Sequence, residues 1–165
     1  MPDFSKYFDY NATTPMSDEA QRAWEEANSA AWHNPSSLYR EAGVARVRLD
    51  ECREDLADEL GIDLPERIVF TSGATEANNA AIRFLIEQSE KPVAVSAIEH
   101  PCVEAVATPH LESGKVREIP VDPATGIVDV ERLQSWIKSE EVSAVSVMAA
   151  NNETGVLQPW LELAE

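Results

Sequence analysis

Short apolar runs alternate with helical patterns through the second half of the sequence. Val and Ile are frequent in four runs, at 67–70, 93–97, 116–121 and 142–148, and helical patterns lie between them at about 74–88, 101–112 and 129–138. Strands that alternate with helices are typical of α/β domains with parallel sheets. We therefore predict an α/β fold whose largely parallel sheet is flanked by helices. Pro120 predicts that its run is weakly paired or lies at an edge.

The first sixty residues predict two helices. Ser17 is a suitable N-cap for the first, and the second covers about 38–60 before Gly61, a residue type that often follows the last helical turn. The apolar residues of this long helix recur every three or four positions and predict a buried stripe: Ala45, Leu49, Cys52, Leu56 and Leu60. Cys52 is therefore expected to pack against other residues rather than to react.

Charge and composition exclude several classes of function. The formal net charge is −17, from 30 acidic and 13 basic residues, which disfavours nucleic acid and anionic membranes as partners. No apolar stretch is long enough to span a bilayer, and the first residues carry no secretory signal, so we expect a cytoplasmic protein. Two cysteines outside a CxxC pair predict neither a disulfide framework nor a metal site.

Residues 69–79 predict a strand, a small polar turn and a helix. The turn contains Thr71, Ser72 and Gly73, and the helical pattern begins directly after it. Small residues let a ligand approach the backbone, and the free N–H groups of a helix N-terminus favour an anion such as phosphate. The hydroxyls of Ser72 and Thr75 could add donors. The alternative is an ordinary N-cap with no ligand.

Two further polar loops follow predicted strands, at 99–101 and 151–155. In parallel α/β sheets, ligands bind beyond the carboxyl ends of the strands, so these loops and 71–75 are expected to share one edge. Each has a simpler interpretation: His100 as an N-cap or surface residue, and Asn151 and Asn152 as turn formers. Glu76 and Glu153 would repel a phosphate and are expected to point away from it as capping or scaffold groups.

Five motifs then resemble one known family in order and spacing. They are Tyr-Asn-Ala-Thr-Thr-Pro at 10–15, Asn-Pro-Ser-Ser at 34–37, Phe-Thr-Ser-Gly-Ala-Thr-Glu-Ala-Asn-Asn at 70–79, Glu-His at 99–100 and Asn-Asn-Glu-Thr-Gly at 151–155. The sequence resembles the cysteine desulfurases of the class V aminotransferase family, which use pyridoxal phosphate. The resemblance implies a fold-type I large domain, with 1–15 as an N-terminal segment and 16–165 as the N-terminal part of the cofactor-binding domain.

The resemblance also implies roles for particular residues. Ala74 and Thr75 are the expected phosphate contacts, His100 the ring that stacks on the cofactor and moves protons, and Asn152 the amide near the cofactor's phenolic oxygen. The implied reaction converts L-cysteine to L-alanine and leaves a persulfide on the enzyme. The implied enzyme is a homodimer that delivers sulfur to an acceptor protein, as in iron–sulfur cluster assembly. His33 and Tyr39 depart from residues that are common in relatives, and neither is expected to be catalytic.

Several catalytic and cofactor-binding residues of the family have no counterpart in this sequence. The lysine that attaches the cofactor, the aspartate at its pyridine nitrogen, the substrate-binding arginine and the nucleophilic cysteine match no position here, and residues 159–165 read as a helix without a stop signal. We therefore expect a truncated domain that is inactive as an isolated chain. Three alternatives stay open: a selenocysteine lyase, another aminotransferase, and a non-catalytic shortened paralogue that acts as a dimerisation or scaffold partner.

Overall fold

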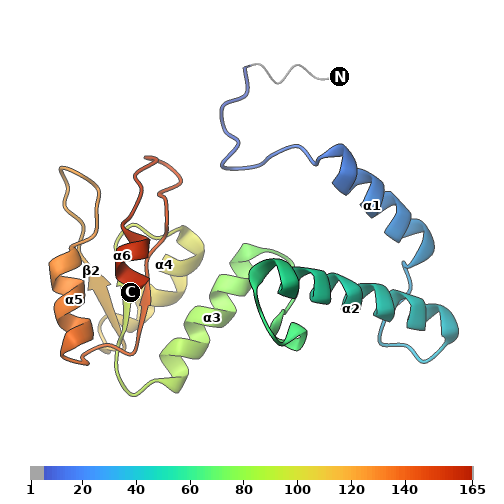
Figure 1. Cartoon of the computed structure of the whole chain (residues 1–165). Coiled ribbons are helices and arrows are strands. Elements are labelled where there is room, and N and C mark those ends of the chain that lie inside the picture. The colour runs from blue at the N-terminus through green and yellow to red at the C-terminus, as the bar shows by residue number, and fades with distance from the viewer. Residues whose placement is uncertain (1–5, 165) are drawn as a thin grey trace. The chain divides into compact units, whose positions relative to one another are not determined.

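The computed structural model describes residues 6–164, with the side chain of the last of these left out, and the chain divides into two compact units. Unit 1 ends at Phe70 and unit 2 begins at Thr71. Figure 1 labels the helices α1 to α6 and the strand β2. No helix within the described residues is both long and apolar enough to cross a lipid bilayer. The division at residue 15 that the sequence suggests stays a prediction.

Unit 1 is built from α1 (Asp18–Ala30), α2 (Arg40–Leu60) and the short 3₁₀ helix η1 (Pro65–Arg67). The Ser17 hydroxyl accepts a hydrogen bond from the Ala20 N–H at 3.1 Å, which confirms the predicted N-cap of α1. Gly61 ends α2 in the left-handed conformation, with φ of 66°. Both helix predictions for unit 1 are therefore confirmed.

The predicted buried stripe on α2 is wrong for three of its five residues: Ala45 is buried as predicted and Leu49 is partly buried, but Cys52, Leu56 and Leu60 are exposed. The buried residues of this helix are Ala42, Ala45 and Ala57. By contrast, Leu60 is 65% exposed, and the thiol-bearing residue Cys52 is also exposed. The helical period was correct, but the other described residues do not cover the face that carries the larger side chains.

The first predicted strand is also wrong. Residues 65–67 form η1, and Ile68 to Phe70 pair with no strand of the described chain. An apolar run becomes a strand only when a neighbouring strand accepts and donates its backbone hydrogen bonds. Val69 is accordingly 77% exposed.

Unit 2 contains a parallel sheet, as predicted. Its strands are β1 (Val93–Ser96), β2 (Val116–Ile119) and β3 (Ala144–Ser146), in the order β2-β1-β3. Val93 pairs with Val116 on one side and with Ala144 on the other, and both pairings are parallel. β2 therefore lies at an edge of this sheet, as Pro120 predicts.

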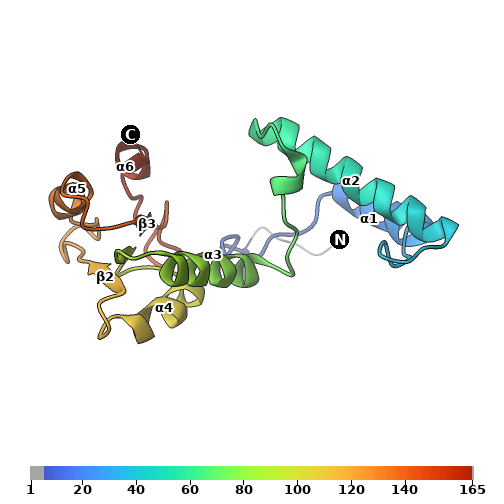
Figure 2. The same cartoon turned by 90° about the horizontal axis from the view of Figure 1, so that it is seen from below.

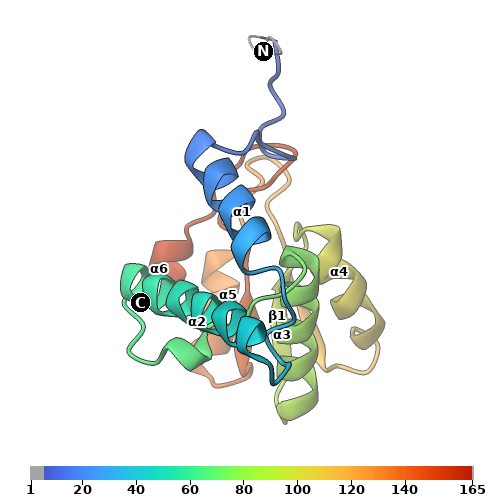
Figure 3. The ribbon, with the colours of Figure 1, turned by 90° about the vertical axis from the view of Figure 1, so that its right-hand side faces the viewer.

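Helices cover both faces of the sheet, and two apolar cores lie between the helices and the strands. The helices are α3 (Ala74–Gln88), α4 (Pro101–Ala107) with the 3₁₀ turn η2 (Thr108–His110), α5 (Val130–Lys138) and α6 (Trp160–Ala164). In Figure 2, α3 and α4 lie on one side of the strands and α5 and α6 on the other. Figure 3 shows α3 and α4 side by side.

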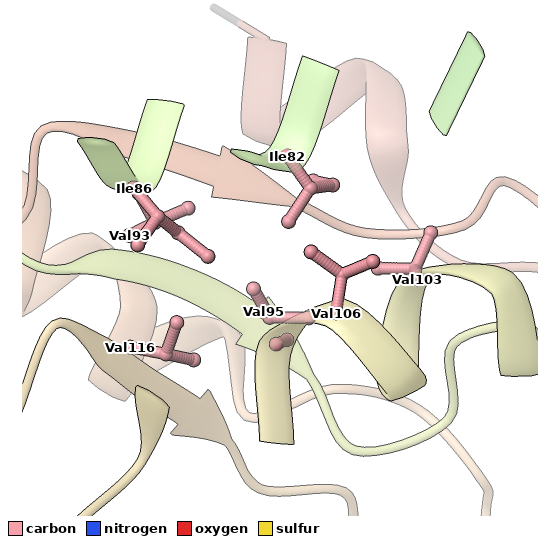
Figure 4. Packing of buried hydrophobic residues seen from close by; sticks show 8 residues of the cluster. Ile82, Ile86, Val93, Val95, Val103, Val106 and Val116 are labelled. Carbon is pink, nitrogen blue, oxygen red and sulfur yellow. The ribbon is translucent and has the colours of Figure 1, made fainter. Parts of the chain in front are cut away.

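The alternation of side chains along β1 builds the two cores. Val93 and Val95 face α3 and α4, where they pack with Ile82, Ile86, Val103, Val106 and Val116 (Figure 4). Ala94, between them, faces the opposite side and packs with Ile119, Val128 and Leu133. All four residues of β1 are buried, so this strand fixes the position of the loop that follows it.

Candidate functional site

Loops at the carboxyl ends of β1 and β3 leave the sheet at the same edge, because the two strands are parallel neighbours. The loop after β1 leads through residues 97–100 into α4. The loop after β3 continues through residues 147–157 and closes on itself with an antiparallel bridge between Ala150 and Leu157. Both predicted polar motifs, at 99–101 and 151–155, lie in these loops.

The N-terminus of α3 presents backbone N–H groups that the capping residue does not satisfy with a side chain. Gly73 is the N-cap and makes no side-chain hydrogen bond. A β-carbon placed on Gly73 would meet nothing within 4 Å, so the space beside this N-cap residue is open. A helix of 15 residues directs its positive dipole end at this point. A helix start of this kind is chemically suited to an anion, and phosphate binding by Ala74 and Thr75 stays a prediction.

Glu76 turns its carboxylate to the preceding loop. Its Oε2 accepts hydrogen bonds from both the N–H and the hydroxyl of Ser72, each at 2.7 Å. These bonds, chiefly the one from the Ser72 hydroxyl, lower the pKa of Glu76 below its ordinary value. Of the two roles expected for Glu76, capping or scaffold, the bonds to Ser72 support the scaffold role, because the N-cap residue is Gly73. The Ser72 hydroxyl donates to Glu76 instead of to a ligand.

His100 is the N-cap of α4. Its Nδ1 accepts a hydrogen bond from the Cys102 N–H at 3.1 Å, and Pro101 occupies the first helical turn as predicted. A nitrogen that accepts this bond must keep its lone pair, so the proton of the neutral ring lies on Nε2. The residue is exposed. His100 thus combines a fixed backbone attachment with a free ring edge.

Two amides connect the start of α3 to the start of α4. Asn79 donates through Nδ2 to the carbonyl oxygens of Thr75, at 2.7 Å, and of Cys102, at 3.1 Å. Asn78 donates to the Cys102 sulfur at 3.3 Å. Cys102 also packs against the core formed by Val93 and Val95 with α3 and α4. The predicted phosphate contacts and the His100 turn are therefore neighbours.

The two adjacent asparagines after β3 differ in burial. Asn151 folds the loop: its Oδ1 accepts hydrogen bonds from the Glu153 N–H at 3.0 Å and the Thr154 N–H at 2.9 Å. Its Nδ2 donates to the Ile98 carbonyl at 3.2 Å, in the loop that carries His100. Asn152 lies next to it on the exposed part of the loop. Asn151 is thus the turn former and Asn152 is exposed.

Glu99 is a site residue to which the sequence analysis gave no role. Its carboxylate accepts from the Ser96 hydroxyl at 3.0 Å and from the Ser146 hydroxyl at 3.5 Å. Burial raises the pKa of Glu99, although hydrogen bonds from Ser96, the Met148 backbone and Ser146 act in the opposite direction. The available signal was its place: an acid three residues after a buried strand and directly before His100.

The structure joins the three predicted loops through specific contacts. Asn79 links the turn of Thr75 to the turn of His100, and Asn151 links the turn of His100 to the loop of Asn152. The edge therefore offers a helix N-terminus, an aromatic ring and an exposed amide. This combination suits a ligand that has a phosphate group and a polar aromatic ring.

The class of the protein follows from comparison with known sequences. The aminotransferase class-V family matches residues 6–165, and the chain belongs to this family. Two relatives give a finer indication. Selenocysteine lyase of Xenopus tropicalis is 37% identical over 96% of this chain and 40% of its own length. Cysteine desulfurase IscS of Rickettsia bellii is 38% identical over 96% of this chain and 39% of its own length.

Solved structures share the fold. A NifS-like protein superposes with a TM-score of 0.82 and 32% identity, over 95% of this chain and 43% of that one. A structure described as SspA in complex with cysteine superposes with a TM-score of 0.76 and 34% identity, over 94% of this chain and 45% of its own. The chain thus has the α/β fold of NifS-like proteins and spans about two fifths of the length of its relatives.

Proposed function

We propose that the chain forms the pyridoxal phosphate-binding part of an enzyme that removes sulfur from L-cysteine, giving L-alanine and an enzyme persulfide. The observation that carries the proposal is the joining of three loops at one sheet edge through Asn79 and Asn151. Membership of the class-V family and relatives named cysteine desulfurase support the choice of reaction.

The start of α3 would hold the phosphate. The N–H groups of Ala74 and Thr75 lie in the first turn, beyond an N-cap that offers no side chain. The carboxylate of Glu76 is engaged by Ser72, so its charge is directed to the preceding loop. Backbone donors of this kind bind phosphate without a lysine, which is consistent with the acidic composition of the chain.

His100 and Asn152 would hold the ring of the cofactor. An exposed imidazole can stack on the pyridine, and its Nε2 is the atom through which a proton would be held or moved, because Nδ1 is bonded to the Cys102 N–H. The Asn152 amide would donate to the phenolic oxygen. When bound, pyridoxal phosphate supplies an electron sink for bonds broken at the amino acid's carbons.

The same proposal has consequences for the whole enzyme. The complete protein would be a cytoplasmic homodimer that passes sulfur to an acceptor protein, for example in iron–sulfur cluster assembly. The isolated chain would be inactive, because Lys6, Lys91, Lys115 and Lys138 lie outside the family's cofactor-attaching motif. A selenocysteine lyase is the second candidate, because the relative from Xenopus tropicalis carries that name.

Titration of the chain with pyridoxal phosphate, followed by calorimetry, tests the site. We expect saturable binding that is weaker for pyridoxal, which lacks the phosphate. His100→Ala and Asn152→Ala should each weaken binding about tenfold, the effect of losing one good contact. His110→Ala is the matched control and should bind like the parent. The absence of binding, or equal binding by the His100 and His110 variants, would refute the assignment.

The reaction needs a separate test. The chain mixed with pyridoxal phosphate and L-cysteine should release no alanine, and with L-selenocysteine it should behave in the same way. Alanine formed from either amino acid by the isolated chain would show that the expected inactivity is wrong. The amino acid that gave it would decide between the two candidate activities.

A further inference from the structure

The geometry points to Glu99 as a positioning residue that holds the loop of His100 and the loop of Asn152 in one fixed arrangement. This inference rests on the proposed function, because it concerns the same site. Glu99 immediately precedes His100, so a displacement of its backbone also moves the imidazole. Its side chain turns to the neighbouring strand instead of to solvent.

The carboxylate joins the ends of two strands. Ser96 is the last residue of β1 and Ser146 is the last residue of β3. Both hydroxyls donate to the same oxygen, Oε1 of Glu99, at 3.0 Å and 3.5 Å. One acceptor that is shared by adjacent strands fixes the distance between the loops that follow them.

A second contact joins the two loops. Asn151, in the loop after β3, donates to the carbonyl of Ile98, in the loop after β1. The loop after β1 therefore accepts two hydrogen bonds from the β3 side of the sheet. The Glu99 carboxylate accepts one from Ser146, and the Ile98 carbonyl accepts one from Asn151. Together these bonds resist both separation and sliding of the two loops.

The position of the Glu99 carboxylate is energetically costly because this residue is partly buried. Ser96 is 4% exposed, and Glu99 borders a cavity of about 50 Å³ that Glu104 and Glu118 also line. A half-buried carboxylate costs solvation energy, and none of the ion pairs among the described residues involves Glu99. Departures from favourable local chemistry are expected where a site is being held in place.

The test compares Glu99→Leu, which removes the acceptor, with Glu99→Gln, which keeps one acceptor oxygen. Glu118→Gln removes a charge from the same cavity and is the matched control. We expect Glu99→Leu to bind pyridoxal phosphate about tenfold more weakly, Glu99→Gln to recover most of the affinity, and the control to bind like the parent. Affinity for inorganic phosphate, which needs only the start of α3, should stay unchanged in all three.

Equal loss of phosphate and pyridoxal phosphate affinity in Glu99→Leu would indicate general damage and overturn the inference. Binding of pyridoxal phosphate like the parent's by a folded Glu99→Leu would overturn it as well. If Glu99→Leu does not fold, Ser146→Ala removes one of the two hydroxyl contacts, and it should weaken pyridoxal phosphate binding but not phosphate binding. Parent-like binding of both by Ser146→Ala would then refute the role.

Hydrogen exchange separates this inference from the proposed function. If the parent chain binds no pyridoxal phosphate, the proposed function fails. Glu99 is then judged by amide protection: Glu99→Leu should speed exchange in both loops, at residues 97–100 and 147–152, and leave β2 unchanged. Unchanged exchange in the two loops would refute the positioning role whatever the cofactor result.

Discussion

The two units of the chain show the same helical periodicity but differ in what the helices bury. In unit 1, the longest helix buries only alanines, and Leu60 stays 65% exposed. In unit 2, helices on both faces of the sheet bury residues such as Ile86 and Leu133, which are 2% and 0% exposed. A periodic apolar pattern therefore predicts that a helix forms. The stability of that helix depends on other elements that pack against its apolar face, and the pattern does not identify them.

Replacement of a core leucine should give the largest difference between the units. Leu133→Ala, in α5, leaves a cavity in the second core and should lower the free energy of unfolding by about 2–5 kcal/mol. The matched change Leu60→Ala, in α2, should alter it by less than about 0.5 kcal/mol. Urea denaturation followed by circular dichroism measures both. Similar losses would show that α2 is packed as firmly as α5.

A buried amide in unit 2 should have the next largest effect. Gln158 is 4% exposed, accepts from the Val128 N–H at 2.9 Å and donates to the Gly126 carbonyl at 2.8 Å. Gln158→Leu leaves both backbone groups unpaired and should cost about 1–3 kcal/mol. Gln88→Leu, at the exposed end of α3, is the control. The same denaturation experiment applies, and a neutral Gln158→Leu would contradict the role of this amide.

Helix caps test whether the units differ in cooperativity. Ser17→Ala in unit 1 and Asp129→Ala in unit 2 each remove a side chain that accepts from a first-turn N–H, a loss of about 1 kcal/mol. We expect the first to speed hydrogen exchange only in α1, whereas the second lowers the unfolding midpoint of all of unit 2. A lower midpoint for unit 2 in Ser17→Ala would mean that the units unfold together.

The smallest effect is a pH dependence in unit 2. Burial raises the pKa of Glu99, so the folded chain binds that proton more tightly than the unfolded chain does. This stabilisation is complete below the ordinary glutamate pKa and is lost as the pH rises through the raised value. The stability of the parent relative to Glu99→Gln should therefore fall as the pH rises from the ordinary glutamate pKa, about 4.3, through the raised one.

Two other carboxylates act in the opposite sense. Hydrogen bonds from Ser72 lower the pKa of Glu76, and the bond from Arg117 lowers that of Glu141. Their contributions are present above the ordinary glutamate pKa and are lost as the pH falls through the lowered values. Comparison of each parent curve with the matching Gln variant isolates one group. A Glu99→Gln curve parallel to the parent's would contradict the assigned direction.

Local signals in the sequence predicted much of unit 2. The helix expected at 74–88 is α3, and Pro120 placed β2 at an edge. His100 and Pro101 marked the start of α4 because capping chemistry depends on adjacent residues. Where neighbouring residues in the sequence determine the structure of a segment, the sequence pattern is enough to predict it.

Predictions failed where the deciding partner is distant. The run ending at Phe70 has strand composition but no neighbouring strand among the described residues, and Cys52 has helical spacing but no covering layer. Glu99 was missed because its two hydroxyl partners are brought together only by the pairing of β1 with β3. The bond that holds Asn151 in the loop likewise depends on a distant partner, because Ile98 lies 53 positions before Asn151.

The amide of Gln158 has a consequence for changes in loop length. It ties the turn at Gly126, whose φ is 75°, to the segment that closes the Asn151 loop, and a β-carbon on that glycine would lie 3.2 Å from the Val156 side chain. Surface turns usually tolerate an inserted residue. Here an insertion after Asp122 would withdraw the Gly126 carbonyl from its donor and pull on a loop thirty positions further along. A change in the length of the turn at Gly126 is therefore expected to disturb the Asn151 loop as well.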